Sequence, residues 1–245
     1  MNSLGESLNA VGQPVGKPLP GWRPPAWPSR EGRAGRFCAL EPLDPEGHGA
    51  RLYEELSADA TNALWTYLPY GPFGDVLDYE AWLRRNATSQ DPLFFTILDA
   101  STRRAIGLQS YLRITPEAGS IEVGHLQFSP RLQRTPAGTE ALWFLLSGAF
   151  AMGYRRCEWK CDSLNAKSRA AAERLGFQLE GVFRQATVYK GRNRDTAWYS
   201  IIDSEWPALD RAFRGWLAED NFDAAGRQKR RLAEFRAEAG TSIAQ

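Results

Sequence analysis

The chain has 245 residues, of which 43% are hydrophobic and 24% charged, a composition typical of a globular protein rather than a fibre or a disordered chain. Lys and Arg number 30 against 29 Asp and Glu, so a net charge of +1 argues against a general nucleic-acid binder. The longest apolar stretch, 141–153, is too short to span a bilayer, and the N-terminus lacks the pattern of a secretory signal. We therefore expect a soluble, cytoplasmic protein with no membrane partner.

Residues 1–35 hold six of the fifteen prolines together with Trp22 and Trp27. Prolines at this density predict neither helix nor sheet ladder. Because disordered tails are poor in aromatic residues, we expect the segment to lie extended across the domain or a partner, with the tryptophans as anchors.

The folded core is predicted to begin at residue 36, with a strand closed by Pro42 and a helix that opens near Pro45. A loop rich in aromatic residues, Trp65–Phe73, separates this helix from a second one at 75–87. Such a loop either walls a pocket or packs beneath the helices as a small core. Three strands of an antiparallel meander follow, at 93–99, 105–114 and 120–128.

The hydrophobic period then becomes helical, and residues 139–153 are apolar nearly all round, as in a helix buried against a sheet. The remaining predicted elements are a strand at 156–162, a helix at 165–177, strands at 181–192 and 194–202, an amphipathic helix at 206–217, and a basic run at 227–232 in the tail. A strand–helix–strand crossover after a meander predicts an α/β (α+β) fold with a mixed, mostly antiparallel sheet flanked by helices. We divide the chain into an extended segment (1–35), one domain (36–203), and a C-terminal helix with its tail (204–245).

Histidines and cysteines are too few and too scattered for a metal centre. His48 and His125 are the only histidines, and the three cysteines do not form two closely spaced pairs, so we expect no metal site. Cys157 and Cys161 alternate with Trp159 on one face of a predicted strand, which favours buried apolar thiols.

The start of the apolar helix could hold a phosphate. Thr135 is placed to cap it, and Pro136 suits the first helical position because its missing N–H would have no partner there. Three residues of the first turn still offer N–H donors: Ala137, Gly138 and Thr139. A plainly capped helix is the alternative. Asn165 is a second candidate cap, with Ser168 one turn into the next helix.

In this order, the segments from about 36 to 202 resemble the Gcn5-related N-acetyltransferase (GNAT) superfamily and, within it, the RimJ/RimL-type protein N-terminal acetyltransferases. The family's acetyl-CoA turn, Q/R-x-x-G-x-G/A, is similar to residues 133–138, except that Pro136 replaces the first Gly and removes one pyrophosphate donor. A second family pattern, N-x-x-[SA] followed by L-G-F and E-G, is matched by Asn165, Ser168, Leu175, Gly176, Phe177, Glu180 and Gly181. The strand at 121–125 resembles the family's central strand, whose splay from its parallel neighbour admits the pantetheine arm.

The resemblance implies acetyl-CoA as cofactor, a GNAT-type sheet with a splayed parallel pair, and a set of cofactor-binding residues. That set is Leu126, Gln127, Gln133, Arg134, Thr135, Ala137, Gly138, Thr139 and Asn165. Many GNAT enzymes have a general-acid Tyr where this chain has Ala172, whereas RimJ/RimL-like members often have a Ser where Ser168 falls, so the resemblance implies that Ser168 stabilises the thiolate.

Glu122 is the first candidate for the base that takes the amine's proton. Strand alternation places it on the same face as Gly124, where desolvation would raise its pKa; a carboxylate that merely holds an Arg or a loop is the alternative. His125 falls on the opposite face of a regular strand, although a bulge near Gly124 would change that. We expect His125 to be a neutral, hydrogen-bonded core residue.

The sequence thus predicts an N-acetyltransferase that transfers acetyl directly to a primary amine. A peptide or protein N-terminus is the expected acceptor, a small-molecule amine (antibiotic, toxin or metabolite) is the second candidate, and a non-catalytic acyl-CoA-binding protein is the third. Four aromatic residues are expected to contact the acceptor: Trp65, Tyr67, Tyr70 and Tyr189. The basic turn at 184–194 is either a solvated hairpin or a site for an acidic acceptor or the CoA 3′-phosphate. The Trp-rich N-terminus and the last helix suggest a homodimer.

Overall fold

A mixed eight-stranded sheet is the centre of the fold in the computed structural model, which describes residues 7–241. Its strand order is β3-β4-β5-β6-β7-β8-β10-β9, and only β7 and β8 run parallel. The strands are β3 (Arg33–Ala34), β4 (Cys38–Pro42), β5 (Leu93–Asp99), β6 (Ala105–Thr115), β7 (Ser120–Phe128), β8 (Arg156–Asp162), β9 (Gln178–Tyr189) and β10 (Arg192–Ile202). The predicted mixed, mostly antiparallel sheet is confirmed.

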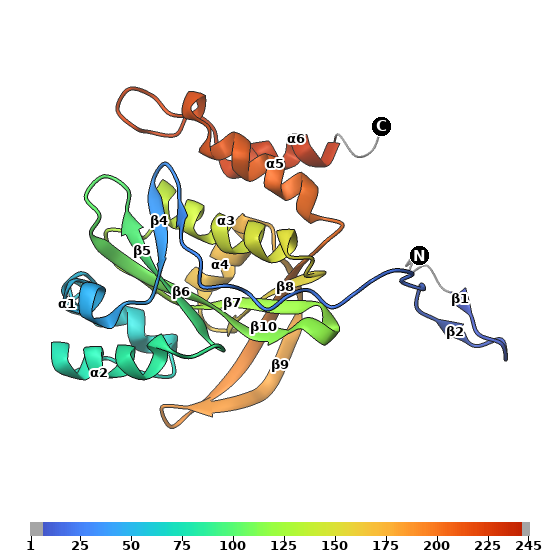
Figure 1. Cartoon of the computed structure of the whole chain (residues 1–245), viewed down its shortest axis with the longest axis horizontal. Coiled ribbons are helices and arrows are strands. Elements are labelled where there is room, and N and C mark those ends of the chain that lie inside the picture. The colour runs from blue at the N-terminus through green and yellow to red at the C-terminus, as the bar shows by residue number, and fades with distance from the viewer. Residues whose placement is uncertain (1–6, 242–245) are drawn as a thin grey trace.

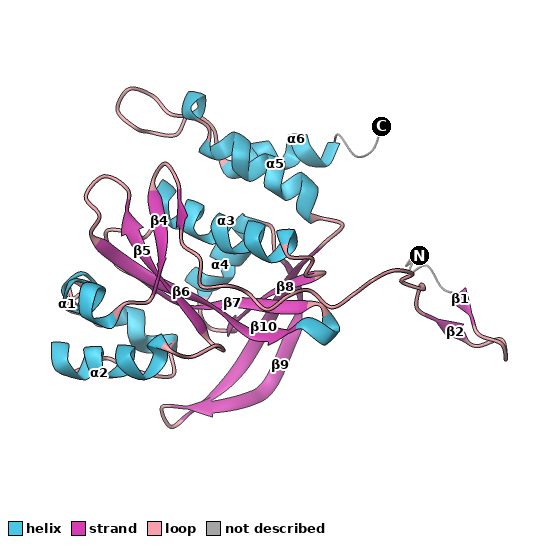
Figure 2. Ribbon diagram, viewed as in Figure 1, coloured by secondary structure: helices cyan, strands magenta, loops and turns pink. Residues whose placement is uncertain are grey.

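Helices cover both faces of this sheet (Figures 1 and 2). One face carries α1 (Pro45–Leu56) and α2 (Val76–Ala87), while the other carries α3 (Pro136–Ala151) and α4 (Ala166–Leu175). Outside α3 lies α5 (Trp206–Leu217), which also packs against α6 (Leu232–Thr241). Two apolar cores result, a large one between the sheet and α3 to α6, and a smaller one beneath α1, α2 and the aromatic loop. No helix within residues 7–241 is long and apolar enough to cross a membrane.

A buried carboxylate ties α3 to the first long strand. Glu140 of α3 accepts hydrogen bonds from the backbone N–H groups of Arg36 (2.9 Å), Phe37 (2.7 Å) and Cys38 (2.8 Å). Glu140 is only 3% exposed. If its carboxylate were lost, no water molecule could accept the hydrogen bonds of these three N–H groups. Burial, and then the charge of Glu140, raise the pKa of the Cys38 thiol. All three cysteines are free and buried, as the alternation in 156–162 predicted for two of them.

The N-terminal segment differs from the prediction in its strand pairing and in the residues that anchor it. The expectation of no sheet ladder is wrong, because β3 pairs with β4, and β1 (Ser7–Leu8) pairs with β2 (Pro14–Val15) in a small hairpin that projects from the domain (Figure 1). Pro14 is tolerated because it is the first residue of its strand. Residues 1–6 of the predicted segment lie outside the described residues.

The remainder of this segment lies extended on the domain, as predicted. Tyr154 donates a hydrogen bond to the carbonyl of Ala26, and Arg30 donates to that of Ala87 at 2.9 Å. Trp27 is largely exposed and does not act as an anchor, whereas two prolines do: Pro25 and Pro28 are buried.

The C-terminal part holds a helix that the sequence analysis did not predict. The basic run at 227–232 leads directly into α6, whose Phe235 packs beside Gly215 of α5. Several cations of the run are paired locally, for example Arg230 with Glu238 and Arg227 with Asp223. The charge of this run is therefore partly neutralised by its own neighbours.

Candidate active site

The sheet opens between its two parallel strands. Pairing of β7 with β8 comprises Ser120 with Arg156, Ile121 with Cys157, and Glu122 with Glu158, and it ends there. Beyond Glu122, β7 pairs only with β6, and β8 pairs only with β10, within the described residues. The predicted splay is thus present, and it lies beside the N-termini of α3 and α4.

A bulge in β7 reorients the residues at this opening. Two residues of β7, His125 and Leu126, lie opposite one residue of β6, between the pairs Ser110–Gly124 and Leu108–Gln127. His125 takes the left-handed conformation, with φ of +51°. The bulge that the sequence analysis considered near Gly124 is therefore found.

The bulge brings His125 to the same face of the sheet as Glu122. Ile121 and Val123 belong to the core under α3, so Glu122 points to the opposite face. The His125 ring contacts Tyr70 and Phe94, which belong to the core on the α1 and α2 side. His125 is half-buried and neutral, as expected, because burial lowers its pKa to about 4.

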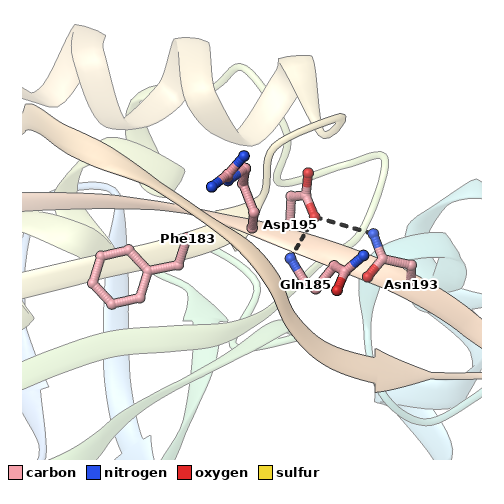
Figure 3. Close-up of a pocket in the computed structure, with 5 residues that line it drawn as sticks. Phe183, Gln185, Asn193 and Asp195 are labelled. Atoms are coloured by element: carbon pink, nitrogen blue, oxygen red, sulfur yellow. Dashed lines mark hydrogen bonds between the residues drawn. The ribbon is translucent and has the colours of Figure 1, made fainter.

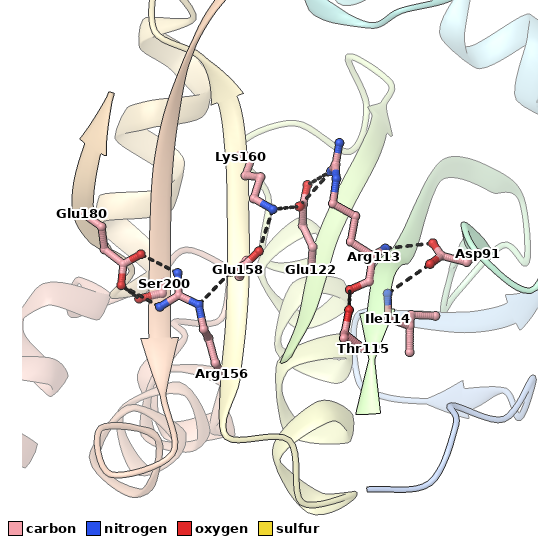
Figure 4. A network of polar contacts seen from close by, with 10 residues as sticks. All are labelled: Asp91, Arg113, Ile114, Thr115, Glu122, Arg156, Glu158, Lys160, Glu180 and Ser200. Atoms are coloured by element: carbon pink, nitrogen blue, oxygen red, sulfur yellow. Dashed lines mark hydrogen bonds and ion pairs between the residues drawn. The ribbon is translucent and has the colours of Figure 1, made fainter. Parts of the chain in front are cut away.

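Glu122 is held between two cations (Figure 4). Nη1 of Arg113 lies 2.8 Å from both of its carboxylate oxygens, and Nζ of Lys160 lies 3.0 Å from Oε2. Lys160 also lies 2.7 Å from Glu158 Oε2 and 3.7 Å from the centre of the Trp198 ring. Lys160 thus separates two carboxylates that the parallel pairing would otherwise place directly opposite each other.

Burial sets the proton affinity of Glu122. Its side chain is 3% exposed, and desolvation raises the pKa above that of an ordinary carboxyl, although Arg113 and Lys160 pull it down. A raised pKa makes the carboxylate a better proton acceptor near neutral pH. Glu122 also forms the ion pair with an Arg that was predicted as its alternative role, here with Arg113.

The network of charged side chains extends from Glu122 and Lys160 to β8, β9 and β10 (Figure 4). Arg156 pairs with Glu158 at 2.7 Å and with Glu180, which also accepts from the Ser200 hydroxyl at 2.7 Å. Glu180, part of the E-G pattern, therefore joins β9 to β8 and β10. The sequence analysis missed Arg113 and Lys160; strand alternation put Lys160 on this face but could not show its partner.

The turn before α3 has the predicted cap. Thr135 Oγ1 accepts from the N–H of Gly138 at 3.3 Å, with Pro136 at the first helical position. Gln133 Nε2 donates to the Phe128 carbonyl at 2.7 Å, and Arg134 takes a left-handed φ of +63°. The backbone donors that helix geometry leaves without a carbonyl partner lie here, at Thr135 and in the first turn.

Gly138 is required by close packing as well as by its place in this turn. A Cβ atom added there would lie 3.0 Å from the Leu132 carbonyl oxygen and 3.4 Å from the Phe128 ring. A bulkier residue must therefore shift the loop that positions the helix terminus. Ala137 and Thr139 are buried beside it.

The start of α4 also has the predicted cap. Asn165 Oδ1 accepts from the N–H of Ser168 at 3.1 Å, and Ser168 Oγ accepts from the indole Nε1 of Trp159 at 3.0 Å. The Ser168 hydroxyl in turn forms a hydrogen bond to the Cys161 thiol, and this bond lowers a thiol pKa that burial raises.

The four aromatic residues assigned to the acceptor lie in different surroundings. Trp65 is 5% exposed and belongs to the core under α1 and α2, which is the alternative foreseen for the aromatic loop. Tyr67 donates to the Leu164 carbonyl at 3.2 Å. Tyr189 donates to Asp162 Oδ2 at 2.8 Å, and burial raises its pKa to about 12. Tyr70 lies on the His125 ring, beside the opening.

The basic hairpin turn is tied to the aromatic loop. Lys190 Nζ donates to the Trp65 carbonyl at 2.6 Å, and Arg192 donates to the Thr66 carbonyl at 3.0 Å. Both carbonyls belong to a 3₁₀ helix, Ala63–Tyr67, at the start of the loop. The turn that joins β9 to β10 therefore closes one side of the face that carries Glu122 and His125.

A shallow depression of about 750 Å³ lies farther along the same hairpin (Figure 3). Asp195 organises it by accepting from the backbone N–H of Gln185 at 2.7 Å and from Asn193 Nδ2 at 3.0 Å. Phe183 and Arg184 complete its lining. No sequence pattern indicated this depression, because it depends on the left-handed backbone of Gln185 and the shifted register beside it.

Comparisons with known proteins agree with this geometry. The sequence model of the acetyltransferase (GNAT) domain matches residues 39–178. A GCN5-related N-acetyltransferase from Brucella melitensis is 45% identical over 89% of this chain and 100% of its own, with a TM-score of 0.87. A probable acetyltransferase of the GNAT family from Chromobacterium violaceum ATCC 12472 is 42% identical over 80% of this chain and 98% of its own, with a TM-score of 0.74.

The microcin C7 self-immunity acetyltransferase MccE, solved in complex with acetyl-CoA and AMP, has the same fold. It is 21% identical over 69% of this chain and 93% of its own, with a TM-score of 0.60. No curated protein matches the chain. The chain belongs to the GNAT acetyltransferase family and is an acetyltransferase.

Proposed function

We propose that the protein uses acetyl-CoA to acetylate a primary amine by direct transfer in a ternary complex. The observation that carries this proposal is the opening between β7 and β8, with two capped helix N-termini beside it and the buried carboxylate of Glu122 on the face opposite α3. One ligand can therefore approach from each face of the sheet.

The residues around the opening fit acetyl-CoA. Backbone N–H groups at Thr135 and Ala137 would hold the pyrophosphate, beside the Gly138 N–H that caps onto Thr135 Oγ1, and Asn165 would bind the pantetheine. When bound, acetyl-CoA supplies an activated acyl group as a thioester. The backbone of Leu126 and Gln127, where β7 has no partner on the β8 side, is assigned to the acyl oxygen.

Two side chains are assigned to proton movement. Glu122 accepts the proton of the attacking amine, a role that its raised pKa supports. Ser168 donates a hydrogen bond to the departing thiolate, a role supported by its place in the first turn of α4 and by its bond to Cys161, which already lowers the pKa of one sulfur. Many GNAT enzymes protonate the thiolate with a Tyr at the position of Ala172. In this assignment no residue takes over that proton transfer, and Ser168 only stabilises the thiolate.

A peptide or protein N-terminus, as in the RimJ/RimL-like group, is the acceptor we propose. A small-molecule amine is the second candidate, because the bonds from Lys190 and Arg192 to the 3₁₀ helix close one side of the acceptor face. Acetylation of a peptide panel with free α-amines, measured beside simple alkylamines, separates the two.

Calorimetric titration with acetyl-CoA, beside desulfo-CoA and ATP, tests the cofactor assignment. We expect micromolar binding of both CoA compounds and none of ATP. Absence of CoA binding would show that Pro136 has abolished the phosphate site, and the proposal would fail.

Substitution of Gly138 should weaken this binding. Gly138→Val pushes a branched side chain against the Leu132 carbonyl, so the turn must move, and we expect the Kd for acetyl-CoA to rise at least roughly tenfold. Gly240→Val is the matched control, because this glycine also lies in a helix but has no atom within 4 Å of an added Cβ. Equal Kd values for Gly138→Val and the wild type would remove the turn from the binding site.

Substitution of Ser168 should affect turnover rather than binding. For Ser168→Ala we expect kcat to fall roughly 10²-fold while the Kd for acetyl-CoA changes little, since a donor to the thiolate acts only as the bond breaks. Ser168→Thr keeps the hydroxyl and should restore most of the rate. If alanine and threonine variants turn over alike, the hydroxyl has no catalytic role.

A further inference from the structure

Four side chains form a continuous hydrogen-bonded row beneath the opening. Tyr79 Oη lies 2.8 Å from Gln127 Oε1, Gln127 Nε2 lies 3.2 Å from Tyr70 Oη, and Tyr70 Oη lies 3.0 Å from His125 Nδ1. Tyr79 and Gln127 are fully buried, so water does not compete for these bonds. The row connects α2 and the aromatic loop to the bulge of β7.

One direction gives every polar proton of this row an acceptor. The hydroxyl of Tyr79 must donate to Gln127 Oε1, because a carbonyl oxygen only accepts. The amide nitrogen of Gln127 then donates to Tyr70, whose single proton has His125 Nδ1 as its sole acceptor within residues 7–241. Since Nδ1 accepts, the neutral imidazole carries its proton on Nε2.

The surroundings of the ring keep it neutral. Tyr70 from the aromatic loop stacks on it, with 5.6 Å between the ring centres and 16° between the ring planes. The ring centre of Phe94 in β5 lies 5.4 Å from that of His125. Burial, together with the charge of Arg113 on β6, lowers the pKa of His125 to about 4, although the charge of Asp91 acts in the opposite direction. An imidazolium is therefore disfavoured over the whole range from pH 5 to 8.

His125 lies beside the opening between β7 and β8. His125 immediately precedes Leu126 and Gln127, and the bulge gives it the same face as Glu122. Within residues 7–241, Nε2 makes no hydrogen bond, and it is not among the buried polar atoms that lack a partner, so it keeps contact with solvent. The chain thus presents a fixed N–H donor on the acceptor side of the opening.

We propose that His125 is a substrate-binding hydrogen-bond donor, oriented by Tyr70, that selects amines carrying a carbonyl oxygen beside the amino group. This inference rests on the proposed function and narrows its acceptor to α-amino carbonyl compounds, such as a peptide N-terminus. A donor beside Arg113 binds an oxygen lone pair and does not bind an ammonium group. His125 cannot take the amine's proton, because Nε2 is already protonated and Nδ1 is occupied, and Glu122 is left as the base.

Nitrogen-15 NMR of the histidine rings tests the donor without any assay of activity. The chain has two histidines, so a His48→Gln variant assigns both signals. We expect His125 to show the Nε2–H tautomer with shifts constant from pH 5 to 8, and Tyr70→Phe to mix the two tautomers. An Nδ1–H tautomer, or titration near pH 6.5, would overturn the proposal.

Kinetics with two matched acceptors tests the selectivity. A dipeptide amide with a free α-amine is compared with an alkylamine of similar size that lacks the carbonyl. We expect His125→Phe and Tyr70→Phe to lower the ratio of kcat/KM for the peptide to kcat/KM for the alkylamine about tenfold or more. His125→Asn keeps an N–H donor and suits a left-handed backbone, so it should retain part of the preference.

The outcomes of these experiments are distinguishable. An unchanged ratio of the two acceptors in both His125→Phe and Tyr70→Phe, with acetylation intact, would overturn the role of His125 and leave the proposed function standing. Tyr70→Phe keeps the fold of the loop in either case, since it removes one oxygen from a ring that remains packed on Trp82. Absence of acetyl transfer by the wild type to either amine would overturn the proposed function and this inference together.

Discussion

Glu122→Gln is expected to lower kcat by roughly 10³-fold while the Kd for acetyl-CoA stays within about twofold. The amide has the shape of the carboxylate and still bonds to Arg113, but it cannot accept the proton of the amine. The wild type should lose activity as pH falls through the raised pKa of Glu122, because the carboxyl is then protonated. The residual activity of Glu122→Gln should not show this decrease at low pH.

Steady-state rates from pH 5 to 9 and calorimetric titration of both proteins provide the measurements. Glu158→Gln is the matched control, since Glu158 shares Lys160 with Glu122 and lies opposite it in the parallel pair. Wild-type turnover in Glu122→Gln would rule out the carboxylate as base and leave it only its ion pairs with Arg113 and Lys160.

Glu140→Gln is expected to destabilise the fold by about 3 kcal/mol. The carboxylate accepts from three consecutive backbone N–H groups, at residues 36–38, and an amide turns one of its two oxygens into a donor that faces donors. Buried donors left without an acceptor are costly because no water replaces the lost bond. The free energy of unfolding in urea is the quantity to measure.

Glu54→Gln is the control for this substitution, because Glu54 is an exposed carboxylate in a surface ion pair and should leave the unfolding midpoint unchanged. If Glu140→Gln unfolds at the same urea concentration as the wild type, the three N–H groups find other acceptors. The anchoring of β4 to α3 would then rest on apolar packing alone.

Local patterns predicted most of the fold because they act over short stretches of chain. A short apolar run after Pro92 identified the strand at 93–99, and alternation gave the faces of the strand at 156–162. Capping chemistry placed Thr135 and Asn165 at the starts of α3 and α4. The helix α6 was missed because the charged residues before it hid a short pattern, and its burial depends on packing against α5. β3 was missed because a two-residue strand carries no periodicity.

Side chains whose partners are distant in sequence could not be predicted. Glu140 sits in an apolar helix about a hundred residues from the strand it holds, so its position indicated neither burial nor partner. The clamp on Glu122 needs the register of β7 against β8, which strand alternation alone does not give. Similarly, the sequence suggested a bulge near Gly124, but the hydrogen bond between His125 Nδ1 and Tyr70 Oη joins side chains 55 residues apart, which no local pattern indicates.

Three hydrogen bonds that close one side of the acceptor face all end on backbone carbonyl oxygens. Lys190, Arg192 and Tyr67 all donate to backbone carbonyl oxygens, at residues 65, 66 and 164. A carbonyl oxygen persists whichever side chain its residue carries, so mutation of the accepting residues leaves these three bonds in place. Evolution can therefore exchange the side chains of the accepting residues, at positions 65, 66 and 164, and so alter the acceptor side without losing these three contacts.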